Sequence, residues 1–305
     1  MRRLKNGVLI ALGSTLVTCA TGSALTTNLE CVADTGLFEH NPNNNLGGMS
    51  FVTAGTTALP SRSRALLKFD PAAVIPSNAT VISAELSVVV VGANGFGHDF
   101  GVHHVLRDWG EGSGSGVSQG VGLGSPANSG EATWNARFYP GTQWSQPGAE
   151  AGVDYLVQSS ASATMNSFTM VFTSQSLAAD VEAWLQDPDS NFGWLLKIDD
   201  ENSTVTASKF ATREDSANAP VLKVEYELPT TPTAPTLGDF GRFAGEIRFS
   251  FNGESGLTYT VEFTGDPATT NWVTLTNISA LPSPTVIQIA DSLKPANRFY
   301  RARTP

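Results

Sequence analysis

Short runs of apolar residues, either alternating with polar ones or unbroken, fill residues 25–228 between clusters of glycine, proline, asparagine and serine. Alternation with a period of two is typical of a β-strand that buries one face, and an unbroken β-branched run is typical of one buried on both. The clearest predicted strands are residues 49–54, 64–69, 81–91, 101–107, 167–173, 192–198, 207–212 and 221–226. So many short strands predict an all-β fold, closed as a jelly-roll-like β-sandwich.

One predicted strand changes its pattern along its length. Residues 81–91 begin as the alternation ISAELSV and end as VVVV. We therefore expect the first part to be half exposed and the valine run to be covered on both faces.

Another segment carries a helical pattern. The apolar residues that recur at helical spacing are Leu177, Val181, Trp184 and Leu185. Ser176 is the predicted N-cap, and Asp187 with Pro188 is the predicted stop. The sequence thus predicts a single short helix packed across one end of the sandwich.

A stretch of prolines and threonines divides the chain into two domains. Residues 229–236 read PTTPTAPT and are predicted to be an extended linker. Residues 237–305 alternate again, in IRFSFNG, TYTVEF and WVTLTN, and predict a second, small β-sandwich. Its expected core and core margin are Phe249, Phe251, Tyr259, Val261, Phe263, Trp272, Leu275, Phe299 and Tyr300. In the first domain, residues 25–228, the glycine-rich residues 110–130 are predicted to form a long flexible loop.

Residues 1–24 have the pattern of a secretory signal peptide. Arg2, Arg3 and Lys5 form a positive start, an apolar stretch follows, and Gly22 and Ala24 are the small residues of a cleavage site. The apolar stretch is shorter than the ~20 residues that cross a bilayer, and no later segment reaches that length, so no membrane span is expected. We expect an exported protein, either secreted or held at the cell surface. Twin-arginine export remains an alternative route.

The two cysteines bear on anchoring and on stability. Cys19 is an alternative lipidation site, although Thr18 differs from the Gly, Ala or Ser that normally precedes such a cysteine. Once the leader is removed Cys31 stands alone, so we expect no internal disulfide. We interpret Cys31 as a buried small hydrophobic residue.

The order of several short motifs carries a family resemblance. They are ADT at 33–35, NNNLG at 43–47, RALLKFD at 64–70, IPSNATV at 75–81, RDW at 107–109, ATWN at 132–135, FATRE at 210–214 and PVLKVEY at 220–226. In this order they resemble the DNRLRE-type domains, which are similar to the family-96 carbohydrate-binding modules of secreted bacterial proteins. The resemblance covers residues ~30–228 and implies a β-sandwich that binds carbohydrate without catalysis. Residues 237–305 resemble the short C-terminal β-modules of large secreted bacterial proteins, which implies no activity.

Aromatic and hydrogen-bonding residues gather in residues 132–144, ATWNARFYPGTQW. The apolar C–H faces of sugars stack on aromatic rings, and amide and guanidinium groups bind sugar hydroxyls. We expect Trp144 and Tyr139, placed near turn-forming Pro-Gly pairs, to stack on a ligand, with Arg137 and Asn135 as hydrogen-bonding partners. The alternative for Trp144 and Tyr139 is that they pack inside the sandwich. The tryptophans of this region that we expect to pack are Trp109 and Trp134.

Calcium is the one ion that the sequence suggests. Acidic, asparagine-rich loops offer the hard oxygen ligands that calcium prefers. Asp34 is the candidate ligand, by similarity to ion-stabilised β-sandwich modules, and no other cofactor is expected. The segment DPDSN at 187–191 lacks the glycine and glutamate of a calcium loop and is interpreted as a turn. His103 and His104 are neighbours on a predicted strand, so their rings should face opposite sides and not share a metal.

The net charge limits the classes of ligand that we expect. Removing residues 1–24 takes away three bases and no acids, so the net charge falls from −10 to −13. This net negative charge disfavours nucleic acid as a partner, and it should repel polyuronates and sulfated polymers at long range. We therefore expect a neutral polysaccharide, unless Arg62, Arg64 and Arg137 converge and hold a carboxylate at short range.

These observations favour an exported, non-catalytic protein that binds a polysaccharide or a cell-surface glycan. No G-x-S-x-G, H-E-x-x-H or Walker-type motif occurs. The first alternative is a structural or adhesive surface protein without a sugar site. A more distant alternative is an extracellular polysaccharide-degrading enzyme, because the 22 acids of residues 25–229 leave room for a carboxylate pair.

Export predicts the N-terminus of the mature protein. Protein recovered from culture medium should begin near Leu25, since Gly22 and Ala24 flank the best small-residue cleavage site. N-terminal sequencing and intact mass spectrometry measure this. A secreted form that retains Met1 would contradict the prediction, and a fatty-acylated Cys19 would establish the lipoprotein alternative.

Overall fold

The structure is a computed structural model that describes residues 24–115, 123–229, 234–268, 270–292 and 297–304. These residues form two compact units, which divide between Pro229 and Thr230. The predicted leader lies outside the described residues except for Ala24, and so does the central part of the predicted linker, residues 230–233. No helix among the described residues is long and apolar enough to cross a membrane.

The first unit is built from strands and one α-helix, α1 (Gln175–Gln186). Its strands are β1 (Leu25–Phe38), β2 (Asn44–Asn45), β3 (Phe51–Thr56), β4 (Arg62–Phe69), β5 (Thr80–Gly92), β6 (Asp99–His104), β7 (Ser125–Pro126), β8 (Ala136–Phe138), β9 (Thr142–Gln143), β10 (Ala161–Thr164), β11 (Thr169–Thr173), β12 (Trp194–Ile198), β13 (Ser208–Ala211) and β14 (Val221–Glu227). Two single-turn 3-10 helices lie at Pro71–Ala73 and Pro188–Ser190. All eight strands expected from the hydrophobic pattern are present, and the all-β sandwich fold is confirmed.

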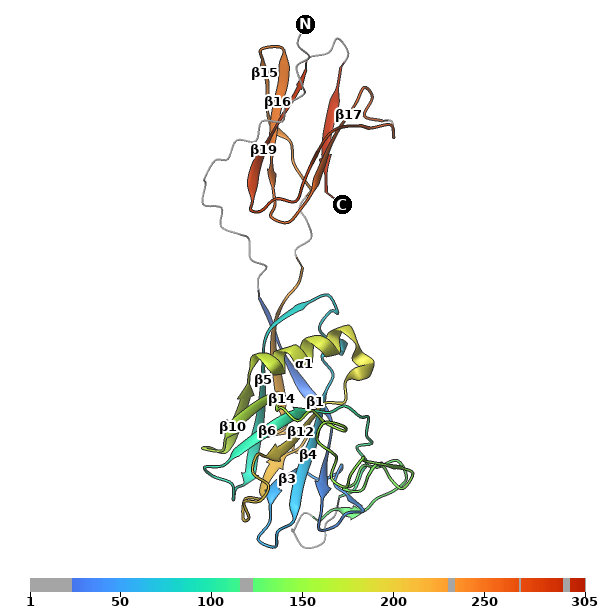
Figure 1. The fold of residues 1–305 in the computed structure, drawn as a ribbon, viewed down its shortest axis with the longest axis vertical. Coiled ribbons are helices and arrows are strands. Elements are labelled where there is room, and N and C mark those ends of the chain that lie inside the picture. The colour runs from blue at the N-terminus through green and yellow to red at the C-terminus, as the bar shows by residue number, and fades with distance from the viewer. Residues whose placement is uncertain (1–23, 116–122, 230–233, 269, 293–296, 305) are drawn as a thin grey trace. The chain divides into compact units, whose positions relative to one another are not determined.

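The strands form two layers that share corner strands (Figure 1). The β5 sheet contains β11, β5, β14 and the first half of β1, and the β12 sheet contains the second half of β1 with β4, β12, β6 and β10. The long strand β1 passes from one sheet to the other at a bulge between Cys31 and Ala33. At the opposite corner, the short strand β13 pairs with both β5 and β3. The hydrophobic pattern did not reveal β1, whose burial follows no simple period.

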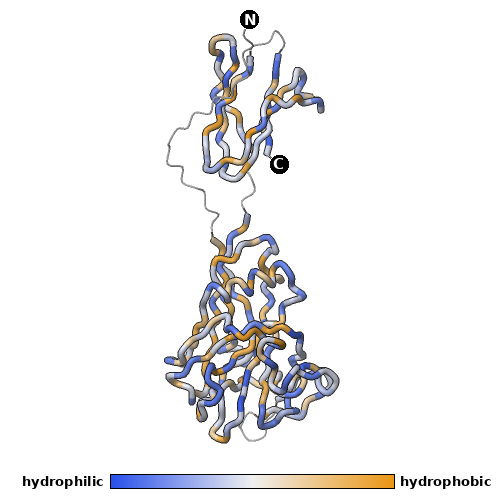
Figure 2. Tube along the Cα trace, in the orientation of Figure 1, coloured by the Kyte–Doolittle hydropathy of each residue, from blue (hydrophilic) through white to orange (hydrophobic). Residues whose placement is uncertain are grey.

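The main hydrophobic core fills the space between the two sheets. Apolar and hydrophilic positions alternate along the strands (Figure 2), and the inward side chains of both sheets join one buried cluster. Helix α1 lies across one end, close to β5 (Figure 1), and contributes Leu177, Val181, Trp184 and Leu185 to this core as expected. Its N-cap is Ser174, whose Oγ accepts a hydrogen bond from Leu177 N at 2.9 Å, and the expectation of Ser176 was wrong.

A second core lies on the outer face of the β12 sheet. The outward residues Leu37, Leu66 and Leu195 are covered by the described parts of segment 105–155, residues 105–115 and 123–155, which act as a third layer. Its buried apolar side chains include Val105, Trp109, Ala132, Trp134, Trp144, Ala149 and Tyr155. The expectation that Trp109 and Trp134 pack is confirmed. The expectation that Trp144 faces a ligand is corrected, because its side chain is 4% exposed and its Nε1 donates to Thr133 O at 2.9 Å.

A buried amide holds this third layer in place. The Nδ2 group of Asn45 donates to Thr35 Oγ1, Glu111 O and Ala132 O, while its Oδ1 accepts from the backbone N–H groups of Gly47 and Gly114. A Cβ at Gly114 would lie 2.2 Å from Asn45 O, so only glycine allows this close approach. The described parts of the glycine-rich segment are therefore anchored to the core. Residues 116–122, the rest of the predicted flexible loop, lie outside the described residues.

The second unit is a small β-sandwich. Its strands are β15 (Gly238–Phe243), β16 (Glu246–Gly253), β17 (Tyr259–Thr264), β18 (Val273–Ile278), β19 (Thr285–Ser292) and β20 (Phe299–Arg303). They form the sheets β15-β16-β19 and β18-β17-β20 around Phe249, Phe251, Tyr259, Val261, Ile287 and Ile289. Four of the expected core residues are thus buried. Phe299, an expected margin residue, is 44% exposed.

The second core predicts how a Trp144→Ala variant behaves. Removing this buried indole should cost about 3–5 kcal/mol of unfolding free energy, because it leaves a cavity under the third layer. Urea unfolding followed by tryptophan fluorescence reports on the first unit, which holds five of the six tryptophans. The half-buried Tyr139→Ala is the comparison and should cost clearly less. An unchanged midpoint for Trp144→Ala would show that the indole does not pack.

Candidate functional site

The expected ligand residues of segment 132–144 do not converge on one surface. The Asn135 side chain donates to Asn43 Oδ1 at 2.9 Å, and Arg137 donates to Asp108 O at 3.0 Å. Tyr139 is half buried, and its backbone N–H donates to Glu131 O. The Trp144 backbone N–H donates to Asn135 O, while its ring points into the second core. The stacking pair expected of Trp144 and Tyr139 is therefore not formed, because the Trp144 ring is buried.

The three arginines considered as a carboxylate clamp each bind a group of the protein itself, although the guanidinium groups of Arg62 and Arg64 both lie over the Trp134 ring. Arg62 pairs with Glu39 at 2.7 Å, and Arg64 makes two hydrogen bonds of 2.7 Å to the carboxylate of Glu201. Arg64 also donates to the carbonyl oxygens of Gly148 and Ala149, which ties the third layer to β4. These contacts make Arg64 a structural residue and leave no open arginine cluster with Arg137.

Asp34, the expected calcium ligand, is fully buried on β1. Its Oδ2 accepts from Arg213 N at 2.8 Å and from the thiol of Cys31, and its Oδ1 has no hydrogen-bond partner. Burial raises the pKa of this carboxyl to about 7; the charges of Glu214 and Glu111 also raise it, and the Arg213 N–H opposes the shift. Among the described residues, no three His, Cys, Asp or Glu side chains are grouped so that they hold a metal ion. Asp34 thus lacks companion ligands of these types.

The histidine pair lies as the strand period requires. On β6, His103 faces the third layer, where its Nδ1 contacts Leu156 O and its ring meets Tyr155 edge-on. His104 faces the main core, where its Nδ1 contacts Asp180 Oδ1 at 2.9 Å. The expectation that the two rings lie on opposite sides is confirmed.

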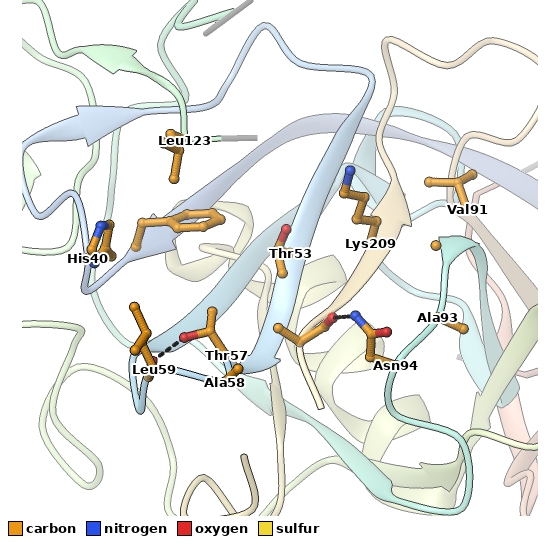
Figure 3. Close-up of a pocket in the computed structure, with 13 residues that line it drawn as sticks. His40, Thr53, Thr57, Ala58, Leu59, Val91, Ala93, Asn94, Leu123 and Lys209 are labelled. Carbon is orange, nitrogen blue, oxygen red and sulfur yellow. Dashed lines mark hydrogen bonds between the residues drawn. The ribbon is translucent and has the colours of Figure 1, made fainter. Parts of the chain in front are cut away.

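A pocket of about 680 Å³ opens on the outer side of the corner formed by β3, β13 and β5 (Figure 3). Thr53, Lys209 and Gly92 lie side by side on these three strands, since Lys209 is directly opposite both of the others. The remaining lining residues are Phe38, His40, Thr57, Ala58, Leu59, Val91, Ala93, Asn94, Leu123 and Ala207. Its volume is in the range of small-ligand sites.

Buried hydroxyl groups fix the walls of this pocket. Ser208 Oγ accepts from the backbone N–H groups of Asn94 and Gly95 and donates to Thr206 O, so the β5–β6 loop is held against β13. The Asn94 side chain donates to Ala207 O at 2.9 Å (Figure 3). Gly55, at a φ of 113°, passes so close to Thr206 O that a Cβ would lie 2.6 Å away. The pocket is therefore held by bonds within the fold.

The lining combines apolar surface with a few hydrogen-bonding groups. Phe38, Leu59, Val91 and Leu123 supply apolar surface, and Thr53, Thr57 and Asn94 supply hydroxyl and amide groups. Lys209 is the one lysine or arginine among the described residues of the lining, and these include no aspartate or glutamate. The Lys209 Nζ lies 4.3 Å from the centre of the Phe51 ring. The arrangement suits a polar but uncharged ligand with apolar faces.

The hydrophobic pattern did not predict this pocket, and the expectation for the valine run of β5 was wrong. The valine run was expected to be covered on both faces, yet Val91 is 44% exposed and lines the pocket, while Val88 and Val90 are buried. The one signal for an exposed strand end that the sequence offered was the position of the valine run, which ends directly before Gly92. Which other strands lie beside it depends on the pairing of β13, which no local pattern encodes.

Neither the comparison with models of protein families nor that with curated proteins finds a match for this chain.

The buried carboxyl of Asp34 predicts a pH-dependent stability. The folded protein holds a proton on Asp34 between about pH 4 and pH 7, whereas the unfolded chain does not, so the unfolding free energy should fall as pH rises through this window. The contribution is on the order of a few kcal/mol. Asp34→Asn removes the titrating group. The unfolding free energy of this variant minus that of wild type should therefore be larger at pH 8 than at pH 5. Urea unfolding of both proteins at both pH values measures this, and a pH-independent difference would show that Asp34 does not titrate there.

Proposed function

We propose that this protein is an exported, non-catalytic carbohydrate-binding protein whose first unit holds a glycan in the pocket of β3, β13 and β5. The observation that carries the proposal is the preformed pocket itself, with apolar surface beside hydroxyl and amide groups. Sugars present apolar C–H faces and hydroxyl groups together, so they match such a lining. The resemblance of residues ~30–228 to DNRLRE-type domains and family-96 carbohydrate-binding modules supports the same function.

We propose a neutral polysaccharide or cell-surface glycan as the ligand. The net charge of −13 after leader removal opposes polyanions at a distance, and the single lysine of the pocket is half covered beside Phe51. Glycoside hydrolysis generally uses two carboxyl groups flanking the scissile bond. The described residues of the pocket lining include no aspartate or glutamate, which favours binding over hydrolysis.

A structural or adhesive surface protein is the second candidate. The observation that favours it is the burial of Trp109, Trp134, Trp144, Trp184 and Trp194, all in the first unit. If these tryptophans serve only to fill the cores, the first unit has no exposed indole ring on which a sugar could stack. On this hypothesis the pocket has no glycan ligand.

A glycan array of neutral and uronic-acid polysaccharides, probed with residues 25–305, tests the proposal, with calorimetry on the best ligand. Lys209→Met and Asn94→Ala should each weaken binding by about 1 kcal/mol, roughly fivefold, because the first removes a hydrogen-bonding group from the lining and the second also removes the bond that holds Ala207 O at the pocket wall. Lys223→Met is the matched control, since Lys223 is an exposed strand lysine on β14 outside the lining. Salt-sensitive binding to polyuronates would contradict the neutral ligand, release of shorter sugars would establish an enzyme, and no binding at all would favour the structural candidate.

A further inference from the structure

Two phenylalanines form an exposed aromatic pair that joins the loop between β5 and β6 to the start of β11. Phe96, in the loop between β5 and β6, is 47% exposed, and Phe168, just before β11, is 59% exposed. Their ring centres are 5.4 Å apart and the rings are nearly perpendicular, at 89°. Two large apolar side chains that touch each other in solvent form a patch, whereas isolated exposed apolar residues are common and need no explanation.

The backbone under this pair is fixed. Gly97 N donates to Met165 O and Met165 N donates to His98 O, both at 2.9 Å, so the two loops are joined to each other. Val90 N donates to Phe168 O at 2.8 Å, which joins the pair to β5. Below it, the Phe100 ring packs so closely against Gly95 that a Cβ there would lie 2.9 Å away. The rings are therefore presented by an ordered support, and binding would need little reorganisation.

The pair and the pocket share one loop. Ala93 and Asn94 line the pocket, and Phe96 follows two residues later. Because consecutive Cα atoms are about 3.8 Å apart, the Cα of Phe96 lies within about 8 Å of the Cα of Asn94. Exposed residues near the pair in the sequence are Asn166, Ser167 and Thr169 beside Phe168, and Asp99 three residues after Phe96. Aromatic rings with amide and hydroxyl groups beside them match the apolar faces and the hydroxyl groups of a sugar chain.

We propose that Phe96 and Phe168 form a second subsite, on which the same glycan chain stacks after leaving the pocket. The inference rests on the proposed function and deepens it, because it makes the ligand an extended polysaccharide and not a single terminal sugar. A short oligosaccharide fills the pocket alone, and a longer one also reaches the aromatic pair.

The test measures how affinity depends on ligand length. The full exported chain is titrated by calorimetry with cello-, laminari-, manno- and xylo-oligosaccharides of two to six sugar residues. Phe96→Ala and Phe168→Ala should weaken binding of the longest bound ligand roughly tenfold, the scale of one lost aromatic stacking contact, and leave the shortest bound ligand unchanged. Phe168→Trp should keep the gain of affinity with length. Phe240→Ala is the matched control, since Phe240 is a 57% exposed phenylalanine of the second unit.

The outcomes separate the second subsite from the proposed function. If Lys209→Met weakens binding while both alanine variants keep the wild-type length dependence, the pocket binds glycan and the second subsite is wrong. Equal losses for short and long ligands would also overturn it, since they would indicate damage to the pocket loop. If wild type binds none of these oligosaccharides and none of the array polysaccharides, the proposed function fails together with the subsite. Thermal unfolding of each variant controls for folding.

Discussion

The β12 sheet is buried on both faces, the inner one apolar and the outer one a mixture of leucines with Arg64 and His103, and the architecture of the first unit follows from the need to cover it twice. All five residues of β12 are buried, and β4 contributes Leu67 to the main core and Leu66 to the second one. One face of the sheet is covered by the β5 sheet and helix α1. The other face is covered by segment 105–155, which supplies tryptophans because few other side chains bury as much area from a loop.

A layer made of loop needs polar anchors, since its backbone groups find few partners in a strand ladder. Asn45 satisfies groups from three segments, and Arg64 holds two carbonyl groups of the covering layer while its charge is neutralised by Glu201. These buried contacts explain why residues that look suited to bind a ligand are engaged inside the protein. They also explain why the arginines of β4 are not available for an acidic sugar.

The β5 sheet has no such cover at its corner with β13 and β3, and this is where the pocket lies. The strands meet there because β13 pairs with both neighbours, and Ser208 holds the following loop in place. The same loop carries Asn94 into the pocket and Phe96 into the exposed aromatic pair. One short strand thus determines the positions of both proposed contact surfaces.

The hydrophobic pattern was enough to predict the class of fold, eight strands of the first unit, the helix and the faces of β6, because each of these follows from a local period of two or of 3.6 residues. It did not reveal β1, because a strand that bends between two sheets at Cys31 and Ala33 exposes no constant face. Nor did it show that Trp144 packs and Val91 is open, since a residue's burial depends on what covers it from a distant part of the chain. Which faces are covered, and therefore where the candidate site lies, follows from long-range strand pairing and from the third layer, and neither of these has a local signature in the sequence.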